Sequence, residues 1–568
     1  MTKNSTILSA ILAFALVLRL WGIGFGLPGV YHPDEERIVH HALAFGLGDL
    51  NPHYFNYPSL PMYLLFFEYG AFYAFGRLVG VFAGVADLQA LFFTDPTAFY
   101  LIGRATGAIL GTLTVLLAYL LGKKAYGRPA GHAAGSILAV TFLHAENAHY
   151  IATDIWLTFF IAAAFLPILE ILRGGERKAY IWAGFLAGLG AASKYNAATL
   201  ALPIFLAHWW NPRAPGNRWR RIRDGRLWLA ASCMLLAFFI GSPYCFLDFP
   251  KFWEDFRFIS EHMKRGVYDT GGGRHWLDYL FLFFRDPMNS APARWNTLGL
   301  FYLGGTAWGL ITGRKKEWLL LVYPALYFLM IGSWGKCNPR YLIPVFPALA
   351  VLSGGALVAL WRRASSRPLF RIACPLGCLL LAISPVLNIS LNDSMLSRTD
   401  TREEARRWIE ENISPGEKIA LEWDNNATVQ LQETAAGIQD KIRAYQEGRA
   451  ATIHHPAEQM AAVHQMRLAA GRGKAYNIVR IGAVEGLSLL PEGYDLAELR
   501  GRGAQYLVIS SEVYSWFQGE KGRRKYPVHA AFYDTLFSEY TPIQVFAPEN
   551  QPGPTIFIYK LTPFEPSI

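Results

Sequence analysis

Long apolar blocks fill the first two thirds of the chain and decide what it can fold into. Most of the blocks approach the roughly 20 residues that a helix needs to cross a bilayer. Hydrophobic residues make up 52% of the 568 residues, and the blocks stop near residue 389, where a polar segment begins. The pattern predicts a polytopic α-helical membrane domain over residues 1–390 and a soluble domain over residues 391–568.

We predict about 11 transmembrane helices. Their apolar blocks lie at residues 7–27, 100–121, 130–142, 151–172, 180–192, 197–210, 227–246, 297–312, 318–334, 342–361 and 373–389. The first block contains Arg19 and lacks the small-residue cleavage site of a signal peptide, so we expect it to be a retained span.

The positive charge of the chain indicates an orientation in the membrane. The formal net charge is +10, and most of the basic excess lies in short loops between apolar blocks. Such loops face the cytoplasm, so we expect no nucleic-acid partner. The spans alternate consistently if residues 60–82 form a juxtamembrane or re-entrant segment. The alternative is a full crossing there, compensated by a second crossing near residues 80–93. The first arrangement puts loops 28–99 and 247–296 and the C-terminal domain on the outer side.

The C-terminal segment has the alternating signals of an α/β domain. Thr401 and Glu404 form a capping-box pattern, and residues 430–471 have helical periodicity. Predicted strands lie at residues 418–423, 505–510, 543–546 and 555–561. The cysteines predict neither a disulfide framework nor a zinc site by their spacing. They are Cys233, Cys245, Cys337, Cys374 and Cys378.

The stretch 31–63 is the strongest candidate for chemistry. It reads YHPDEERIVHHALAFGLGDLNPHYFNYPSLPMY, with Asp34 and Glu35 adjacent and His32 before them. A polar, ring-rich loop beside a span is a suitable place for chemistry on a lipid-borne substrate. Because Pro33 and the following acids also suit a helix N-terminus, an ordinary solvated loop is the alternative.

Further charged residues fall on the same predicted face. Asp154 begins a span, where a carboxylate is costly to bury and usually has a partner. Lys194 ends another span, and Lys336 and Arg340 flank a short turn. His262, Arg274 and His275 lie in the large outer loop. Acids for an acceptor and cations for a leaving phosphate are the two halves of a glycosyl transfer. The alternatives are a snorkelling Lys194 and an interface anchor at Arg340 beside Tyr341.

Six segments together carry a family resemblance over about residues 1–390. They are YHPDEE, GDLNPHYFNYPSLPMY, HYIATDIWLTFF, SKYN, GSPYCFLDFPKFWEDF and KCNPRYLIPVFPAL. The chain resembles the GT-C integral-membrane glycosyltransferases, in the bacterial branch related to protein O-mannosyltransferases and lipid A aminoarabinose transferases. The resemblance implies a GT-C-like fold in the bacterial inner membrane, with its active site on the outer, periplasmic face.

The resemblance implies inverting transfer from a polyprenyl-phosphate sugar to a glycan, lipid or protein. Asp34 would be the general base with Glu35 beside it, and Asp154 a second acid. The predicted substrate-binding residues are His32, Tyr57, Lys194, His262, Arg274, His275, Lys336, Arg340 and Tyr341. The aminoarabinose transferases carry a Glu-Lys pair where this chain has Asn56 and Tyr57. That departure removes support for aminoarabinose specificity and for a metal at that spot. No cofactor is assigned, and a divalent metal stays an open option.

Two other classes of protein fit parts of the sequence. A transporter or flippase of lipid-linked sugars usually shows inverted repeats and charges near the membrane midplane. Here the polar residues gather at one rim, and we find no repeat. A catalytically silent scaffold on the same fold is the other alternative, because a fold does not determine a function. The predicted partners are membrane lipids and the lipid-linked donor.

Overall fold

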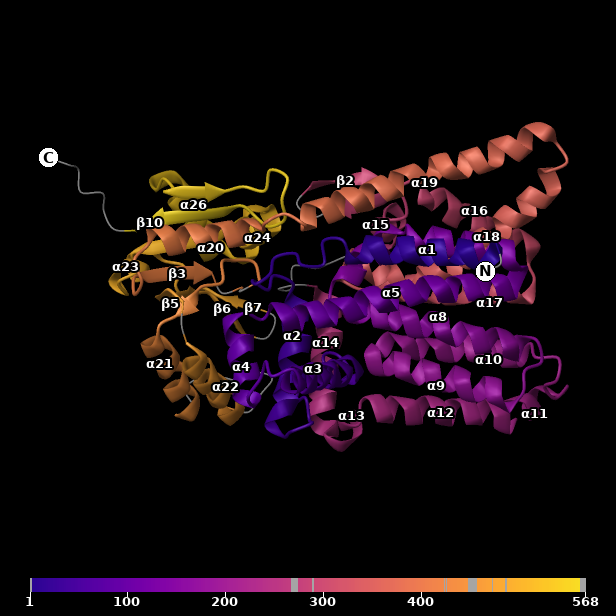
Figure 1. Cartoon of the computed structure of the whole chain (residues 1–568), viewed down its shortest axis with the longest axis horizontal. Helices are drawn as coiled ribbons and strands as arrows, with labels where there is room; N and C mark the ends of the chain where they lie inside the picture. Colours follow the sequence, from indigo (N-terminus) through magenta and orange to yellow (C-terminus); the bar gives the residue numbers. More distant parts are fainter. Residues whose placement is uncertain are drawn as a thin grey trace.

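The protein is a long helical bundle with a smaller α/β part at one end (Figure 1). The computed structural model describes residues 3–266, 274–288, 291–422, 424, 426–447, 457–471, 473–485 and 488–561. Between the bundle and the α/β part lie helices of the predicted outer loops, including α2, α3 and α14 in Figure 1.

Every predicted apolar block contains a helix, although residues 21–27 of the first block form turns. The bundle helices are α1 (Lys3–Leu20), α5 (Thr97–Tyr126), α6 (Arg128–Ala139), α8 (Thr153–Leu172), α9 (Arg177–Ser193), α10 (Ala201–Trp209), α12 (Gly225–Gly241), α16 (Leu298–Thr312), α17 (Lys315–Gly332), α18 (Phe346–Ala364) and α19 (Pro368–Leu396). Two blocks begin with a 3₁₀ turn, namely η3 (Tyr195–Leu200) before α10 and η5 (Pro339–Val345) before α18.

Five helical stretches are long and apolar enough to cross a membrane. They are Thr97–Tyr126, Thr153–Leu172, Arg218–Gly241, Pro339–Ala364 and Pro368–Asn412. Shorter apolar helices include Ser5–Leu20 and Leu298–Thr312. The chain is therefore a polytopic helical protein of the predicted kind, while the count of about 11 crossings stays a prediction.

Small residues let the bundle helices pack closely. A Cβ atom on Gly184 or Gly188 of α9 would collide with the backbone carbonyls of Ala230 or Met234 on α12. A Cβ atom on Gly354 of α18 would lie 2.5 Å from the carbonyl oxygen of Ala130 on α6. In a bilayer, close backbone approach of this kind supplies the packing energy that burial from water supplies elsewhere.

The helices and strands of the predicted outer loops cluster at the end of the bundle that faces the α/β part. They are α2 (Pro33–Ala44), η1 (Phe45–Leu47), α3 (Leu60–Leu78), α4 (Val85–Thr94), α7 (Phe142–Glu146), η2 (Asn147–His149), α13 (Tyr244–Leu247), α14 (Phe249–Arg265), α15 (Trp276–Phe281) and the hairpin β1 (Arg285–Met288) with β2 (Ala291–Trp295). At the other end, α11 (Arg218–Ile222) precedes α12. The segment predicted to be juxtamembrane, residues 60–82, contains the helix α3, and its placement beside the membrane stays a prediction.

A mixed six-stranded sheet forms the C-terminal part. Its order is β4-β5-β3-β8-β10-β9, with β5 and β8 parallel to β3 and β10 antiparallel to β8. The strands are β3 (Lys418–Glu422), β4 (Gln432–Glu433), β5 (Ala475–Ile481), β8 (Tyr506–Ser510), β9 (Gln544–Phe546) and β10 (Ile556–Lys560), beside a small hairpin of β6 (Ala483–Glu485) and β7 (Ser488–Leu490). Its helices are α20 (Thr401–Asn412), α21 (Ala435–Gln446), α22 (Ala457–Ala470), α23 (Leu496–Gly501), α24 (Ser511–Gln518), α25 (Glu520–Lys525) and α26 (Pro527–Glu539).

Two local predictions in this part were wrong. Thr401 does not cap α20, because the Asp400 carboxylate accepts the Arg402 backbone N–H at 2.9 Å and the Thr401 hydroxyl donates to Pro554 instead. Residues 430–471 are not helical throughout, because they begin with β4, which pairs with β5. Residues 448–456 of that stretch lie outside the described residues.

Candidate functional site

Four charged side chains meet at the end of the bundle, and we call them the outer cluster. They are Asp34, Asp154, Lys194 and Arg340. Asp34 and Asp154 each lie in the first turn of a helix, α2 and α8, where the helix dipole favours an acid. Lys194 directly follows α9, and Arg340 lies in η5. All four are largely or fully buried in the structure.

The outer cluster is a continuous chain of ion pairs. Arg340 donates from its Nη1 to an oxygen of Asp34, and its Nε lies 3.7 Å from an oxygen of Asp154. Lys194 Nζ donates to the other oxygen of Asp154 at 2.6 Å. Residues separated by up to 306 positions thus share one site. Because each acid has a cation beside it, burial of the four charges is electrostatically compensated.

Two tyrosines contact residues of the outer cluster. Tyr57 donates its hydroxyl to Asp34 Oδ1 at 3.0 Å. The Lys194 ammonium lies 5.1 Å from the centre of the Tyr341 ring, within cation–π range. Tyr57 and Tyr341 were both predicted from the sequence to lie in the site, and the structure brings both to it.

Arg340 controls the ionisation of Asp34. Burial alone would raise the pKa of the Asp34 carboxyl, but the Arg340 charge lowers it. His32, Arg37 and Lys194 lower it further, and the net result is a pKa well below the usual value. Asp34 is therefore ionised near neutral pH, but as a weak base while Arg340 stays beside it.

A second basic pair lies next to the outer cluster. The Lys336 ammonium donates to His262 Nε2 at 3.0 Å. Burial and then the Arg340 charge lower the pKa of Lys336 to about 8, while the nearby Asp34 raises it. Burial and the Lys336 charge lower the pKa of His262 to about 4, so the ring is neutral and accepts the hydrogen bond. Lys336 is thus close enough to the outer cluster to share its electrostatics.

Glu35 is adjacent to Asp34 in sequence but is bound elsewhere. Both carboxylate oxygens accept from the Arg104 guanidinium, at 2.9 and 2.7 Å, and both side chains are fully buried. Glu35 also accepts the backbone N–H of Ile151 at 3.0 Å. Arg104 in turn donates to the carbonyls of Ile23 and Phe25. This geometry gives Glu35 a positioning role, tying α2 to α5 directly behind Asp34.

The other predicted residues lie around the outer cluster or apart from it. The His32 ring stacks on Tyr150 with centroids 4.6 Å apart, and burial lowers its pKa. Arg274 is exposed and lies over the Trp276 ring. His275 pairs with Asp278 at 2.7 Å. Among the described residues, Arg274 and His275 make no contact with the outer cluster.

Sequence reasoning missed Arg37 and Arg104. Arg37 lies one turn after Asp34 on α2, and its charge lowers the pKa of that carboxyl. The i,i+3 spacing between Asp34 and Arg37 is the sequence signal that could have identified it. Arg104 is a lone arginine inside an apolar block, which usually marks a buried partner. The sequence did not identify Glu35 as that partner.

The fold and the outer cluster together define a class of protein. It is a polytopic helical membrane protein with charged residues gathered at the end of the bundle that faces the α/β part. Comparison with known proteins makes the class more specific. Residues 100–244 match the family profile described as dolichyl-phosphate-mannose-protein mannosyltransferase. The chain thus resembles the GT-C glycosyltransferases, in the branch predicted from its sequence.

Individual relatives and structures agree with that class. A Pseudomonas paraeruginosa protein named undecaprenyl phosphate-alpha-4-amino-4-deoxy-L-arabinose arabinosyl transferase is 27% identical over a match that covers 66% of each chain. A Pseudomonas aeruginosa protein of the same name is 28% identical over 62% of this chain and 61% of its own. The matched regions thus fall short of two thirds of the relatives' length. The crystal structure of apo ArnT from Cupriavidus metallidurans superposes with a TM-score of 0.54, at 14% identity over 98% of both chains. This likeness concerns the fold.

Proposed function

We propose that the chain is an inverting glycosyltransferase, which moves a sugar from a polyprenyl-phosphate carrier to an acceptor on the outer side of the membrane. The observation that carries the proposal is the outer cluster, where buried carboxylates and cations lie side by side. A carboxylate can take the proton of an acceptor, and the cations can stabilise a leaving phosphate. The names of the relatives refer to an undecaprenyl-phosphate sugar, and ArnT has also been solved bound to undecaprenyl phosphate. We assign neither the sugar nor the acceptor.

The proposed reaction is a single displacement. The acceptor oxygen attacks the anomeric carbon while the bond from that carbon to the phosphate oxygen breaks. The acceptor proton passes to Asp34, and the polyprenyl phosphate leaves with the bonding electrons. The carbon has oxocarbenium-like character in the transition state, as in other glycosyl chemistry. Because the phosphate is a good leaving group, the reaction needs no strong general acid.

Donor binding would also activate Asp34. In the structure Arg340 holds the Asp34 pKa well below its usual value, which suits an ion pair better than a base. A phosphate presents oxygens that match the planar donors of arginine. If the donor phosphate takes Arg340 from Asp34, the Asp34 pKa rises toward a value suited to proton transfer. The base would therefore be switched on only when the donor is present.

Asp154 has a different part in this proposal. It accepts from Lys194 and lies near Arg340, so it sits between the two cations. In that position it orients both side chains and limits their repulsion before the phosphate arrives. Lys336, held by His262, adds a further positive charge on the same side.

We also propose the orientation of the chain. About 11 crossings would put the outer cluster, loops 28–99 and 247–296 and the C-terminal domain on the periplasmic face of a bacterial inner membrane. The support is the distribution of basic loops, such as the arginine-rich segment around α11.

Mass spectrometry of whole cells tests the proposed function. The carrier-lipid pool and the envelope glycans are compared in cells with the protein, without it, and with Asp34→Asn. We expect one lipid-linked sugar to accumulate without the protein and the same sugar to disappear from one envelope component. Asp34→Asn should match the deletion at equal protein level. Unchanged pools in the deletion, or full complementation by Asp34→Asn, would contradict the proposal.

A further inference from the structure

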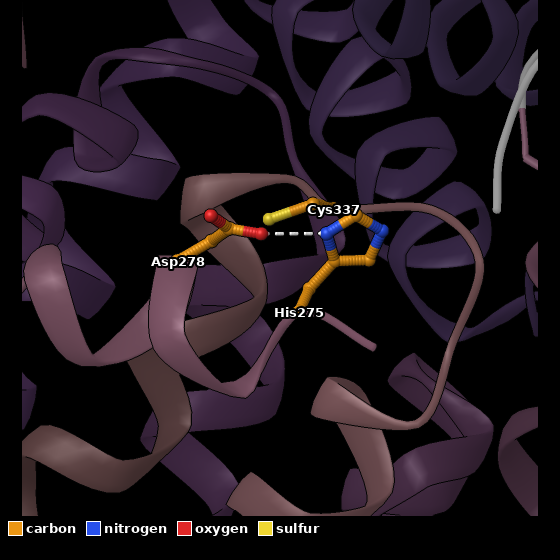
Figure 2. Close-up of side chains that lie close together, drawn as sticks. All are labelled: His275, Asp278 and Cys337. Atoms are coloured by element: carbon orange, nitrogen blue, oxygen red, sulfur yellow. Dashed lines mark hydrogen bonds and ion pairs between the residues drawn. The ribbon is translucent and has the colours of Figure 1, made fainter. Parts of the chain in front are cut away.

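Three metal-binding side chains meet beside the loop that carries Lys336. They are His275 and Asp278 at the start of α15 and Cys337 after α17 (Figure 2). A nitrogen of His275, a carboxylate oxygen of Asp278 and the Cys337 sulfur all lie within 4.8 Å of one another. Figure 2 shows the three side chains turned toward a common point.

The local fold holds these three residues together. His275 is the N-cap residue of α15 and Asp278 follows one turn later, so both side chains lie on one side of the helix. The backbone N–H of His275 donates to the carbonyl of Gly332 at 2.9 Å, which docks α15 on the end of α17. On the other side of Cys337, the backbone N–H of Asn338 donates to the Tyr279 hydroxyl at 3.3 Å. These contacts bring Cys337 to α15 without a metal, so the ligands are largely preorganised.

The ligand set favours one metal. Thiolate sulfur, imidazole nitrogen and carboxylate oxygen are the ligands that Zn²⁺ takes in proteins, usually four at a time in tetrahedral geometry. Ligand atoms on one zinc lie about 3.3–3.8 Å apart, given metal–ligand distances of about 2.0–2.3 Å. The cluster needs only small side-chain movements to reach that spacing. Ca²⁺ and Mg²⁺ prefer oxygen ligands and are poor matches for Cys337.

Cys337 differs from the other cysteines in its exposure. All five cysteines are free thiols, and Cys337 is exposed while the others are buried or half-buried. An exposed thiol on the outer side of a membrane is prone to oxidation. Coordination to a metal would protect it.

We propose that His275, Asp278 and Cys337 bind a Zn²⁺ ion, with water as the fourth ligand. The ion would clip α15 to the 333–338 loop and so fix the backbone that carries Lys336. The thiol proton of Cys337 is released to solvent when the metal binds. The proposed zinc site is separate from the positions of Asn56 and Tyr57, where the sequence had removed support for a metal. Its effect on the donor rests on the proposed function, but the binding of zinc does not.

Metal content of the full chain in detergent tests the zinc site. The protein is loaded with zinc, dialysed without chelator and measured by plasma mass spectrometry, together with Cys337→Ser, Asp278→Asn and the control Cys374→Ser on α19. We expect about one zinc per chain in the wild type and the control, and at least a roughly tenfold lower zinc affinity in the two site variants, since even loss of an outer-shell partner costs about 10–100-fold. Cobalt substitution should give a thiolate charge-transfer band in the wild type and none in Cys337→Ser.

Thermal unfolding separates loss of zinc from loss of folding. Zinc should raise the melting temperature of the wild type and of Cys374→Ser but not that of Cys337→Ser, whose metal-free melting temperature should match the wild type. Wild-type protein that keeps no zinc, or Cys337→Ser that keeps it equally well, would overturn the site. If zinc binds but its removal leaves the donor KM unchanged, the zinc site stands. The proposal that zinc positions Lys336 for the donor is then overturned.

Discussion

Arg340 is the residue on which both halves of the proposed chemistry depend. It pairs with Asp34 in the structure and would pair with the donor phosphate during the reaction. Its planar guanidinium suits both partners, because carboxylate and phosphate oxygens accept two parallel donors. A lysine in its place would keep the charge and lose the two-pronged geometry.

We therefore predict graded damage at position 340. A hydrogen bond to a charged group contributes about 1.5–3 kcal/mol, so Arg340→Ala should lower kcat/KM for the donor by about 10–100-fold. Arg340→Lys should fall between Ala and the wild type. Arg362→Ala, at the exposed far end of α18, is the matched control and should leave donor kinetics unchanged. Equal kinetics for Arg340, Lys and Ala on equal amounts of folded protein would reduce Arg340 to an interface anchor.

The pKa of Lys336 predicts an alkaline limit to activity. Its pKa of about 8 means that its positive charge is lost as the pH rises through that value, and donor binding should weaken there. The kcat/KM for the donor should therefore fall above about pH 8. Lys336→Arg should remove this limb, because arginine stays protonated. An identical limb in both proteins would assign the titration to another group.

The same shift has a consequence for stability, and its sign is opposite to that of an ordinary ion pair. The folded pKa of Lys336 lies below its ordinary value of 10.5 because burial disfavours the charge. Burying the charged Lys336 therefore lowers the folding stability in full below about pH 8, and this loss of stability disappears as the pH rises toward 10.5. Loss of activity above pH 8 is therefore not expected to come from unfolding at this residue.

Single residues were predictable where their chemistry was unusual for their position. Asp34, Asp154, Lys194 and Arg340 are charges at the ends of apolar blocks, and the structure brings all four together. The sequence could not separate Asp34 from Glu35, because adjacent positions on α2 point in different directions. Which direction faces Arg340 and which faces Arg104 is decided by the packing of α5 and η5.

At the scale of elements, the C-terminal part holds the segment that leads to Asp34. Gln430 makes two hydrogen bonds to the backbone of Val30, at 3.1 and 2.5 Å. The Tyr31 hydroxyl donates to Glu403 at 2.7 Å, and Arg402 lies 3.9 Å above the Tyr31 ring. Since α2 begins two residues later, these contacts fix the position of its first turn.

We predict that Tyr31→Phe lowers kcat with little change in the donor KM. The lost hydrogen bond to Glu403 should cost about 1.5–3 kcal/mol. Part of this loss should lower the folding stability, and part should loosen the placement of Asp34. Tyr476→Phe is the matched control, because its buried hydroxyl also donates a hydrogen bond, shared between the backbone carbonyls of Ile409 and Ile413, both within the C-terminal part. We expect that control to lower the melting temperature and spare kcat. Equal effects of both variants on kcat would mean that the contact is only structural.

The strands and helices were predictable to different degrees. The residues at β3, β8, β9 and β10 have the apolar runs and turn signals of strands, and all four strands form. Strand β5 was not predicted, because its sequence AYNIVRI follows a long helical pattern and contains a polar and a basic residue. Its strand conformation comes from its pairing with β4 on one side and β3 on the other. These partners are distant in sequence, so the local sequence does not reveal them.

At the scale of the whole molecule, charge asymmetry predicts which end faces outward. The basic segment around α11 lies at the end of the bundle opposite α2, the helix that carries Asp34 (Figure 1). A cysteine placed at Asn217 should therefore be inaccessible to an impermeant thiol reagent in intact cells. A cysteine at Asp440, on the exposed surface of α21, should be labelled under the same conditions. The native Cys337 is first replaced by serine. Labelling at position 217 without lysis would contradict the orientation.

Turnover by the purified chain tests the central claim most directly, because detergent removes the two sides that a transporter needs. The protein is incubated with the lipid-linked sugar and acceptor identified in cells, and polyprenyl phosphate and glycosylated acceptor are both quantified. We predict equal amounts of the two products from the wild type. Asp34→Asn should turn over about 10²–10⁴-fold more slowly without weakening donor binding, the usual effect of losing a general base. Near-normal turnover by Asp34→Asn, or donor binding by the wild type without release of polyprenyl phosphate, would contradict the account.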